Sequence, residues 1–260
     1  MWNIISAQWY QLIRDKRVRG TFVVMILFNA ALTFANIDGY EEIKGGRITA
    51  DLGSFFCIMG FLFMLVLMAF VVGTDFVDKT LYYEILAGHS RKEVFFGRFL
   101  VALSAGGLGA MAVMLFCPIV LTAIFGWGDM PEAGGVFLRY VLVFGVLLRI
   151  ACETVLIAVI VKNPYATIFV GYIIGCVELL LLLLKELIPG KDMFLRFFSV
   201  CQCMELLSFS GYQGAGQAAG EVLGDFPWRQ IVFMVLIGLT AASTAAVTAA
   251  YAYFKRDDLQ

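Results

Sequence analysis

The amino-acid sequence predicts an all-α integral membrane protein, in which an N-terminal interfacial amphipathic helix is followed by six transmembrane helices. Of the 260 residues, 61% are hydrophobic and only 15% are charged, whereas charged residues make up about 25% of an ordinary soluble domain. The mean hydropathy is +0.88. A soluble domain could not keep so much apolar surface away from water. The apolar residues also occur in long runs, whereas strands of a transmembrane β-barrel alternate apolar and polar residues.

The chemical groups that the sequence lacks exclude several classes of function. Its net charge is −1, so no nucleic-acid partner is expected. The only histidine is His89, which leaves almost no material for a histidine metal site or a catalytic triad. The sequence has no Gly-x-x-x-x-Gly-Lys-Ser/Thr segment that could bind phosphate. We therefore expect a protein that is not an enzyme, with no catalytic residue, metal or cofactor in this chain; any ATP it uses binds another chain.

Residues 1–15 form the first predicted element. Trp2, Ile5, Trp9 and Leu12 recur at helical spacing, and polar residues fall elsewhere around the helix. Such a pattern is typical of an amphipathic helix that lies in the membrane interface, with its indole rings at the level of the lipid headgroups. The alternative is a loose N-terminal tail.

Six segments are apolar enough to form transmembrane helices, each of which needs about 20 mostly apolar residues. The third is long enough to extend beyond the membrane at its cytoplasmic end. The predicted segments cover residues 21–35, 52–72, 95–125, 136–161, 165–188 and 231–253.

The distribution of basic residues predicts the orientation. Six crossings place both termini on one side, which then holds eleven of the 19 lysines and arginines, against seven on the other. Because cytoplasmic loops carry an excess of basic residues, both termini are expected in the cytoplasm. The cluster Arg14, Lys16, Arg17 and Arg19, just before the first segment, supports the same orientation.

The longest connection, residues 189–230, is expected on the extracellular side as a re-entrant or interfacial segment. Its first part, Met193 to Leu207, is apolar enough to form a helix near the outer interface. Its second part, Phe209 to Gly224, is rich in glycine and alanine and is expected to be irregular. No hydrophilic domain is seen besides the transmembrane segments and their connections, so residues 1–260 are expected to form a single transmembrane domain.

The cytoplasmic connection between the second and third segments, residues 73–94, contains the most specific local signals. Thr80 to Leu86 is predicted to be a short helix, and Gly88 stands where the C-terminus of a helix favours a residue with positive φ. Ser90 and Glu93 form a capping box that begins the next helix. The connection is therefore a compact feature that another protein could bind. An ordinary loop that only satisfies the helix ends is the alternative.

This loop resembles one in the permeases of type-2 ABC transporters. In those permeases an acidic-Phe pair, a Thr-Leu pair and a Leu-x-x-Gly-x-Ser-Arg segment follow the second transmembrane helix over about fifteen residues. The matching residues here, in the same order, are Asp75, Phe76, Thr80, Leu81, Gly88, Ser90 and Arg91. The residues at 253–258 also resemble the Phe-x-x-(Lys/Arg)-Asp ending of that family.

The resemblance implies the transmembrane subunit of a bacterial ABC exporter in the plasma membrane. Its loop over residues 75–91 would dock a separate ABC ATP-binding subunit, which would hold the ATP and magnesium. A second permease copy would complete a homodimer or a heterodimer. The small build is most similar to permeases of bacteriocin or lantibiotic immunity and of antibiotic export. The implied substrate is amphiphilic: a peptide antibiotic, a lipid or a hydrophobic drug.

Three charged residues lie inside the predicted transmembrane segments. Arg149 and Glu153 are four residues apart and can pair along one helix face. Glu178, in the next segment, is expected at the same depth as Arg149, and a charge at such a depth is costly unless it is paired or hydrated. Arg149 is therefore expected to be compensated by Glu153 or Glu178. The three residues either hold the two helices together or line a substrate path.

Two other functions remain open at this point. An ion-coupled secondary transporter could use Arg149, Glu153 and Glu178, although no inverted repeat is visible in the sequence. A membrane-embedded enzyme would need a cluster of histidines, paired acidic motifs or a nucleophile with a base, which the sequence does not offer.

Small residues predict where helices pack closely. Gly171 and Gly175 are four residues apart, and alanine repeats at Ala241, Ala245 and Ala249. Such faces allow helices to approach each other. We expect them to pack within one subunit, with a dimer contact as the alternative.

Overall fold

The computed structural model describes residues 2–37, 44–128, 132–183, 197–207 and 228–256, and within these residues every regular element is a helix. Six helices are long and apolar enough to cross a membrane, which is consistent with a multi-pass membrane protein. They are α2 (Lys16–Ile37), α4 (Gly53–Val77), α6 (Arg91–Phe125), α7 (Ala133–Val161), α8 (Pro164–Leu183) and a sixth that starts with α12 (Trp228–Ile237) and ends with α13 (Ser243–Arg256).

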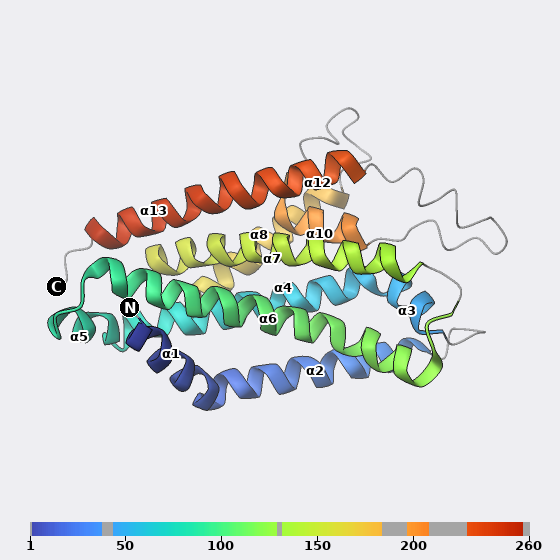
Figure 1. The fold of residues 1–260 in the computed structure, drawn as a ribbon, viewed down its shortest axis with the longest axis horizontal. Coiled ribbons are helices and arrows are strands. Elements are labelled where there is room, and N and C mark those ends of the chain that lie inside the picture. The colour runs from blue at the N-terminus through green and yellow to red at the C-terminus, as the bar shows by residue number, and fades with distance from the viewer. Residues whose placement is uncertain (1, 38–43, 129–131, 184–196, 208–227, 257–260) are drawn as a thin grey trace.

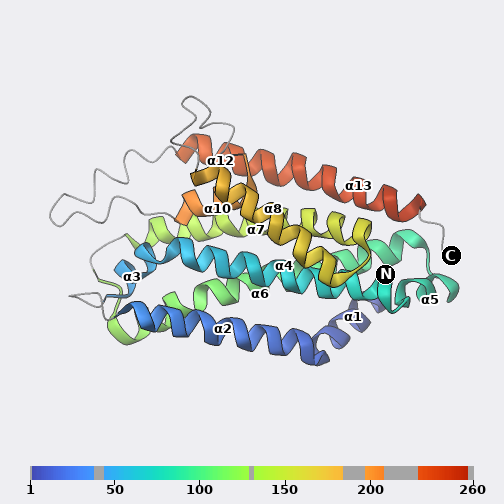
Figure 2. The same cartoon turned by 180° about the vertical axis from the view of Figure 1, so that it is seen from behind.

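The six long helices run side by side along the molecule (Figures 1 and 2). Helix α4 packs against α2, α6, α7 and α8, so it lies at the centre of the bundle. The N-terminus, the end of α13 and the short helix α5 (Thr80–Leu86) lie together at one end, called here the α5 end. The short helices α3 (Gly45–Asp51) and α10 (Ser199–Leu207) lie toward the opposite end, called the α3 end.

The N-terminal segment is the helix α1 (Trp2–Arg14), and it meets α2 at a bend at Asp15 (Figure 1). There the Asp15 carboxylate accepts a hydrogen bond from the Arg17 backbone N–H at 2.8 Å, which satisfies one donor at the start of α2. Helix α1 packs against α6. Ile4 and Gln8 are buried on that side, whereas the Trp2 side chain is 76% exposed.

Cysteine labelling should detect this packing of α1. With the six native cysteines replaced, single cysteines introduced at Ile4 and Gln8 should react slowly with a water-soluble maleimide, because both positions face α6. Cysteines at Asn3 and Ser6, which are exposed, should react fast. Uniform reactivity from residue 2 to residue 13 would mean that this segment is a loose tail.

Helix α6 is longer than a membrane is thick. Its 35 residues span about 52 Å at 1.5 Å per residue, against a hydrocarbon core of about 30 Å. The helix therefore extends beyond the core, as the length of the third predicted segment indicated. The predicted fifth segment reaches residue 188, but α8 is described only to Leu183, so its last part lies outside the described residues.

The sixth long helix contains a local irregularity that the sequence analysis did not predict. Between α12 and α13, residues Gly238–Ala242 form a π-helical turn, η2. Such turns add one residue to a helical turn and are frequent at functional sites. This turn lies inside the hydrophobic stretch that the sequence predicts as one continuous helix.

Two short buried helices line the α3 end. The backbone N–H groups of Gly45 and Gly46, at the start of α3, donate to the carbonyls of Gly126 and Trp127 at 2.8 and 2.9 Å. Helix α10 packs against α4, α7 and α8, with most of its side chains buried. Residues 193–207 were predicted as a helix near the outer interface, and the described part forms α10, which packs on three long helices toward the α3 end. Most of the predicted segment 189–230 lies outside the described residues.

The glycine pair of α8 is buried, whereas the alanine repeat of the sixth long helix is exposed. Space for a side chain is absent at Gly175, where a Cβ atom would lie 2.8 Å from the ring of Phe61, and at Gly171, where it would meet Leu65. Both glycines thus let α8 approach α4 within the subunit, as predicted. The alanine repeat at 241, 245 and 249 is exposed, so the prediction that it packs within one subunit is wrong. Ala246 and Ala250 form the buried face of α13.

Candidate functional sites at the α5 end and within the bundle

The connection between α4 and α6 is almost entirely helical. At the end of α5, the His89 N–H donates to the Glu84 carbonyl at 3.2 Å and the Gly88 N–H to the Ile85 carbonyl at 3.1 Å, with Gly88 at φ 96°. These two bonds form a Schellman motif, which the positive φ of glycine permits. One residue later, the Ser90 hydroxyl accepts from the Glu93 N–H at 3.3 Å, and the Glu93 carboxylate accepts from the Ser90 N–H at 3.2 Å. The predicted short helix, turn and capping box are confirmed.

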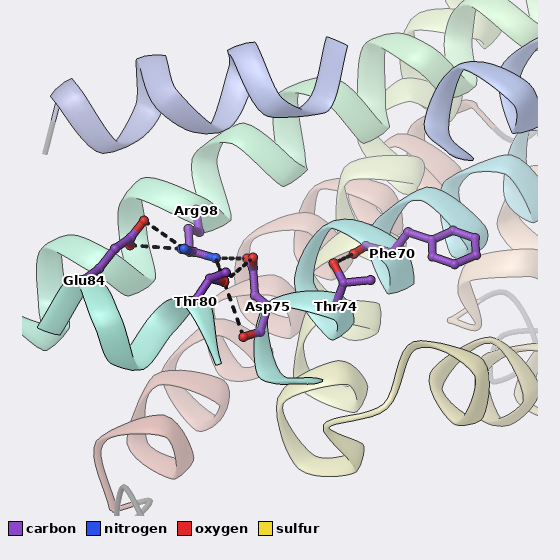
Figure 3. Close-up of polar contacts among 6 residues, drawn as sticks. All are labelled: Phe70, Thr74, Asp75, Thr80, Glu84 and Arg98. Carbon is purple, nitrogen blue, oxygen red and sulfur yellow. Dashed lines mark hydrogen bonds and ion pairs between the residues drawn. The ribbon is translucent and has the colours of Figure 1, made fainter. Parts of the chain in front are cut away.

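Arg98, on α6, joins this loop to the long helices (Figure 3). Its Nη2 and Nε atoms donate to the Glu84 carboxylate of α5, at 2.8 and 3.1 Å. Its Nη1 atom forms an ion pair with Asp75 of α4 and donates to the Thr80 hydroxyl at 3.2 Å. Thr80 in turn donates to Asp75 at 2.9 Å. A single guanidinium group therefore connects α4, α5 and α6.

The same guanidinium also connects to α1. In the amide orientation that gives both groups a partner, the Gln8 side-chain oxygen accepts from Nη2 of Arg98 at 3.2 Å and from Nη1 at 3.3 Å. Gln8 is 6% exposed and Arg98 5% exposed. The five N–H donors of an arginine in a rigid plane suit such a junction, which a lysine could not reproduce. We call Gln8, Asp75, Thr80, Glu84 and Arg98 the Arg98 cluster.

The loop residues fall into buried and exposed groups. Phe76 and Leu81 are 8% and 5% exposed and belong to the hydrophobic core. These two residues, which belong to the loop expected to dock an ATPase, therefore pack inward and offer no apolar surface to a partner. The large apolar side chains of the loop that are exposed are Val77 at 56%, at the end of α4, and Tyr83 at 67% and Leu86 at 82%, on the outer face of α5.

The end of α13 contacts the loop as well. The ring of Phe254 packs 6.3 Å from that of Phe76 and 5.5 Å from that of Phe95, measured between centroids. Nη1 of Arg91 donates to the Lys255 carbonyl at 2.9 Å. The C-terminal residues that carried the resemblance thus pack against the residues of the loop. Asp257 and Asp258 lie outside the described residues.

The second group of charges lies within the bundle, around Arg149 of α7. Its Nε atom donates to Glu153 at 2.8 Å, so the predicted pair at i and i+4 is present. Its Nη1 atom donates to the Phe197 carbonyl at 2.8 Å, which links α7 to the segment that begins α10. Arg149 is only 7% exposed. Its charge is therefore compensated by one carboxylate and one carbonyl group.

Glu178 of α8 is held by a different set of donors. Its carboxylate accepts from the Val200 backbone N–H at 2.7 Å, and the Ser199 hydroxyl lies 3.5 Å away. The Ser199 hydroxyl also lies 3.3 Å from Glu153. The two carboxylates thus approach the same hydroxyl at the start of α10. Among the contacts of the described residues, the ion pair of Arg149 is with Glu153 and not with Glu178.

A cavity of about 360 Å³ opens beside these charges. Arg149 and Glu153 from α7, Glu178 from α8 and Ser199 from the start of α10 line it, together with apolar side chains of α4. The structure thus brings the three charged residues of the sequence analysis to one cavity. With two carboxylates and one guanidinium group, this cavity can bind both apolar and polar parts of a molecule.

Sequence reasoning missed Gln8, Glu84 and Arg98 of the Arg98 cluster, and Ser199 and Gly238 beside Arg149. Arg98 was counted only as a basic residue near a membrane end, and its partner Glu84 is fourteen positions away. Ser199 lies between Phe198 and Val200 in a mostly apolar segment, and nothing in that pattern marks it. A Cβ atom on Gly238 of η2 would lie 2.6 Å from Nη1 of Arg149, so glycine leaves room for the guanidinium group. A glycine in the middle of a long apolar segment was the available signal.

No known protein-family model matches the chain, and no curated protein matches its sequence. The six long apolar helices and the two clusters of polar side chains are therefore the basis for any statement about function.

Proposed function

We propose that this chain is the membrane-spanning permease subunit of an ATP-driven ABC exporter for an amphiphilic substrate. The observation that carries the proposal is the helical loop at the α5 end, whose short helix is joined to α1, α4 and α6 by the Arg98 cluster. A separate ATP-binding subunit docks on this loop through residues 75–91 and holds ATP and magnesium. The permease has both termini in the cytoplasm of a bacterial cell, and α1 lies in the inner membrane interface.

The loop is built to transmit a displacement rather than to absorb it. Only residues 78–79 and 87–90 separate its helices, and the turn after α5 is closed by backbone hydrogen bonds. The Arg98 cluster ties α5 to α4, α6 and α1 by side-chain bonds. Movement of α5 by a bound ATPase would therefore move the long helices together with it.

The exposed residues of the loop suit a specific interface. Tyr83 and Leu86 offer apolar area, and aromatic anchors of this kind often dominate the affinity of an interface. Asp75, Phe76, Thr80 and Leu81 hold the loop in place from within. Gly88, Ser90 and Arg91 fix the turn between α5 and α6.

The substrate path of this proposal includes the cavity beside Arg149. Its apolar walls and three charged residues suit an amphiphilic molecule such as a peptide antibiotic, a lipid or a hydrophobic drug. A second permease copy, identical or related, completes the path, since the described residues of one chain contain six long helices. The immunity and antibiotic-export permeases that the sequence resembles agree with this substrate class.

A second candidate function is an ion-coupled secondary transporter. It is favoured by the placement of Arg149, Glu153 and Glu178 around one cavity inside the bundle, because ionisable residues within a membrane often mark ion or proton pathways. In this alternative the loop at the α5 end would have no partner.

Copurification separates the two functions. The protein, tagged and expressed in its native host, is extracted in a mild detergent and its partners are identified by mass spectrometry. The exporter proposal expects a soluble ATP-binding subunit in stoichiometric amount, and ATP-dependent transport after both are reconstituted in vesicles. Transport driven by a proton or sodium gradient, by the chain without any ATPase, would contradict the proposal and support the alternative.

The docking surface is tested by shortening its exposed side chains. Replacing both Tyr83 and Leu86 by alanine should weaken ATPase binding about 30-fold, since buried anchors of an interface contribute about 2 kcal/mol or more. The matched control replaces Tyr10 and Ile13, which are 56% and 62% exposed at the same end of the molecule. Affinity is measured with the purified ATPase and permease. An equal loss in both double variants would place the docking surface elsewhere.

The turn after α5 is tested separately from the surface. Gly88→Val should misplace α5, because a β-branched residue is strained at φ 96°. Arg91→Glu should reverse a charge at the same turn. Both variants should insert and fold. Their complexes with the ATPase should hydrolyse ATP without transport, or the ATPase should be lost during purification. If both transport like the wild type, the loop does not couple the two subunits.

A further inference from the structure

We infer that a cavity at the α3 end, separate from the charged one, holds an acyl chain of a membrane phospholipid. This cavity has a volume of about 440 Å³ and is lined by α3, α6, α7 and Trp127. None of the residues in the Arg98 cluster or around Arg149 lines it. The inference is therefore independent of the proposed export function.

The shape of the cavity fits one chain of a lipid. On α6 its lining extends from Met111 to Thr122 and continues to Trp127 beyond the end of that helix. From Met111 to Thr122 is about 16 Å at 1.5 Å per residue. One leaflet of the hydrocarbon core is about 15 Å thick, half of about 30 Å. The cavity is thus elongated along the helices, over about the depth of a leaflet.

The opening of the cavity faces the surroundings of the bundle. Ile119, Phe137 and Val141 line it and are 62%, 71% and 48% exposed. These side chains belong to two long apolar helices, so the bilayer is the medium around them. An apolar cavity stays free of water, and lipid chains are the apolar molecules present there at the highest concentration.

Three polar side chains of the lining lie toward the end of the bundle, and a fourth, Tyr140, lies seven residues into α7. Thr122 and Trp127 lie at the end of α6, and Thr49 lies on α3. Trp127 is held in place because its carbonyl accepts the Gly46 N–H at 2.9 Å, and a Cβ atom on Gly46 would come within 3.1 Å of the indole nitrogen. Tryptophan favours the level of the lipid headgroups. A lipid in this cavity would therefore have its ester groups near Trp127 and its chain end near Met111.

Two variants fill the cavity, and one control does not. Ala123→Phe and Ala133→Phe place a ring into it from α6 and from α7, respectively, since both alanines line the cavity. Ala112→Phe adds the same ring at an exposed position of α6 that does not line it. Thermal unfolding in detergent shows whether each variant is folded. Because the two filling variants come from different helices, one of them can fail to fold without loss of the test.

Native mass spectrometry and Trp127 fluorescence measure the occupant. The wild type and Ala112→Phe should retain phospholipid after purification in detergent, and both filling variants should lose it. In proteins with Trp2, Trp9 and Trp228 replaced by phenylalanine, dibromostearate should quench Trp127 saturably, and unbrominated stearate should compete. The apparent affinity for dibromostearate should fall about tenfold or more in the filling variants, and a tenfold loss corresponds to about 1.4 kcal/mol.

Several results would overturn the inference. Equal phospholipid retention by all four proteins would mean that the lipid binds elsewhere. Absence of retained phospholipid in the wild type, or quenching that does not saturate, would mean that Trp127 contacts only the surrounding detergent or bilayer. A change of oligomeric mass in the filling variants, with lipid retention unchanged, would show that a second copy of the chain covers this face.

Discussion

Replacing Arg98 by alanine is expected to lower the free energy of unfolding by about 3–5 kcal/mol, the usual cost of removing one partner from a buried ion pair. Asp75 would lose its cationic partner although its side chain is only 13% exposed. Glu84 is 26% exposed and can turn toward water. The side-chain oxygen of Gln8 would lose both N–H groups that donate hydrogen bonds to it. The measurement is thermal or denaturant unfolding of the purified protein in detergent.

The control for this prediction is another arginine at the same end. The Arg19 side chain is exposed, and its guanidinium group donates to the Arg14 carbonyl at 3.2 Å, so Arg19→Ala should change the free energy by no more than about 0.5 kcal/mol. The double change Arg98→Met and Asp75→Asn should recover part of the loss, because no unpaired charge stays buried. If Arg98→Ala costs no more than Arg19→Ala, the cluster does not hold α5 to the long helices.

The Arg98 variant also tests how the loop acts. If α5 transmits movement through this cluster, Arg98→Ala should still bind the ATPase through Tyr83 and Leu86, while ATP hydrolysis no longer drives transport. Arg98→Lys keeps the charge but cannot reproduce the planar set of donors, and its effect should be intermediate. A variant that is stable, binds the ATPase and transports normally would contradict the proposed coupling.

The second large effect is expected at Arg149. Arg149→Met should destabilise the protein by about 3 kcal/mol or more, since Glu153 loses its ion pair and the Phe197 carbonyl loses its donor inside the bundle. Transport should fall in parallel if the neighbouring cavity is the substrate path. Unfolding in detergent and transport in reconstituted vesicles measure the two effects separately.

Double-mutant cycles decide which carboxylate compensates Arg149. The cycle of Arg149→Met with Glu153→Gln should show a coupling energy of about 1–3 kcal/mol, as residues in direct contact do. The cycle with Glu178→Gln should show a smaller one, because Glu178 accepts from Val200 and Ser199 rather than from Arg149. Larger coupling to Glu178 would contradict these contacts and would mean that the two helices are joined by Arg149 and Glu178.

A change at Gly238 separates a role of Arg149 in transport from a role of Arg149 in helix packing. Gly238→Ala should push against the guanidinium group, since the added Cβ atom would lie 2.6 Å from Nη1. If Arg149 only holds helices together, this variant should lose stability and transport in the same proportion. A stable variant with altered substrate preference would instead place the charged cavity on the path.

The sequence by itself determined the features that depend on near neighbours in the chain. The six apolar segments follow from composition over about 20 residues, because a membrane accepts no unpaired backbone group. Thr80 to Leu86, Gly88 and the Ser90–Glu93 box were predictable because their hydrogen bonds join residues at most five positions apart. The pair of Arg149 and Glu153 follows from helical spacing alone.

Only the tertiary structure decided which distant groups meet. The guanidinium group of Arg98 joins residues as far away as Gln8 because four helices converge at the α5 end. Leu81 turned out to be buried, and Tyr83 and Leu86 exposed, because the packing of α5 fixes which of its faces points inward. Phe76, at the end of α4, is buried because it packs against Phe254 of α13. The position of α10 gave Glu178 its donors. These contacts carry no local pattern, since the free energy that selects them comes from burial of groups far apart in the sequence.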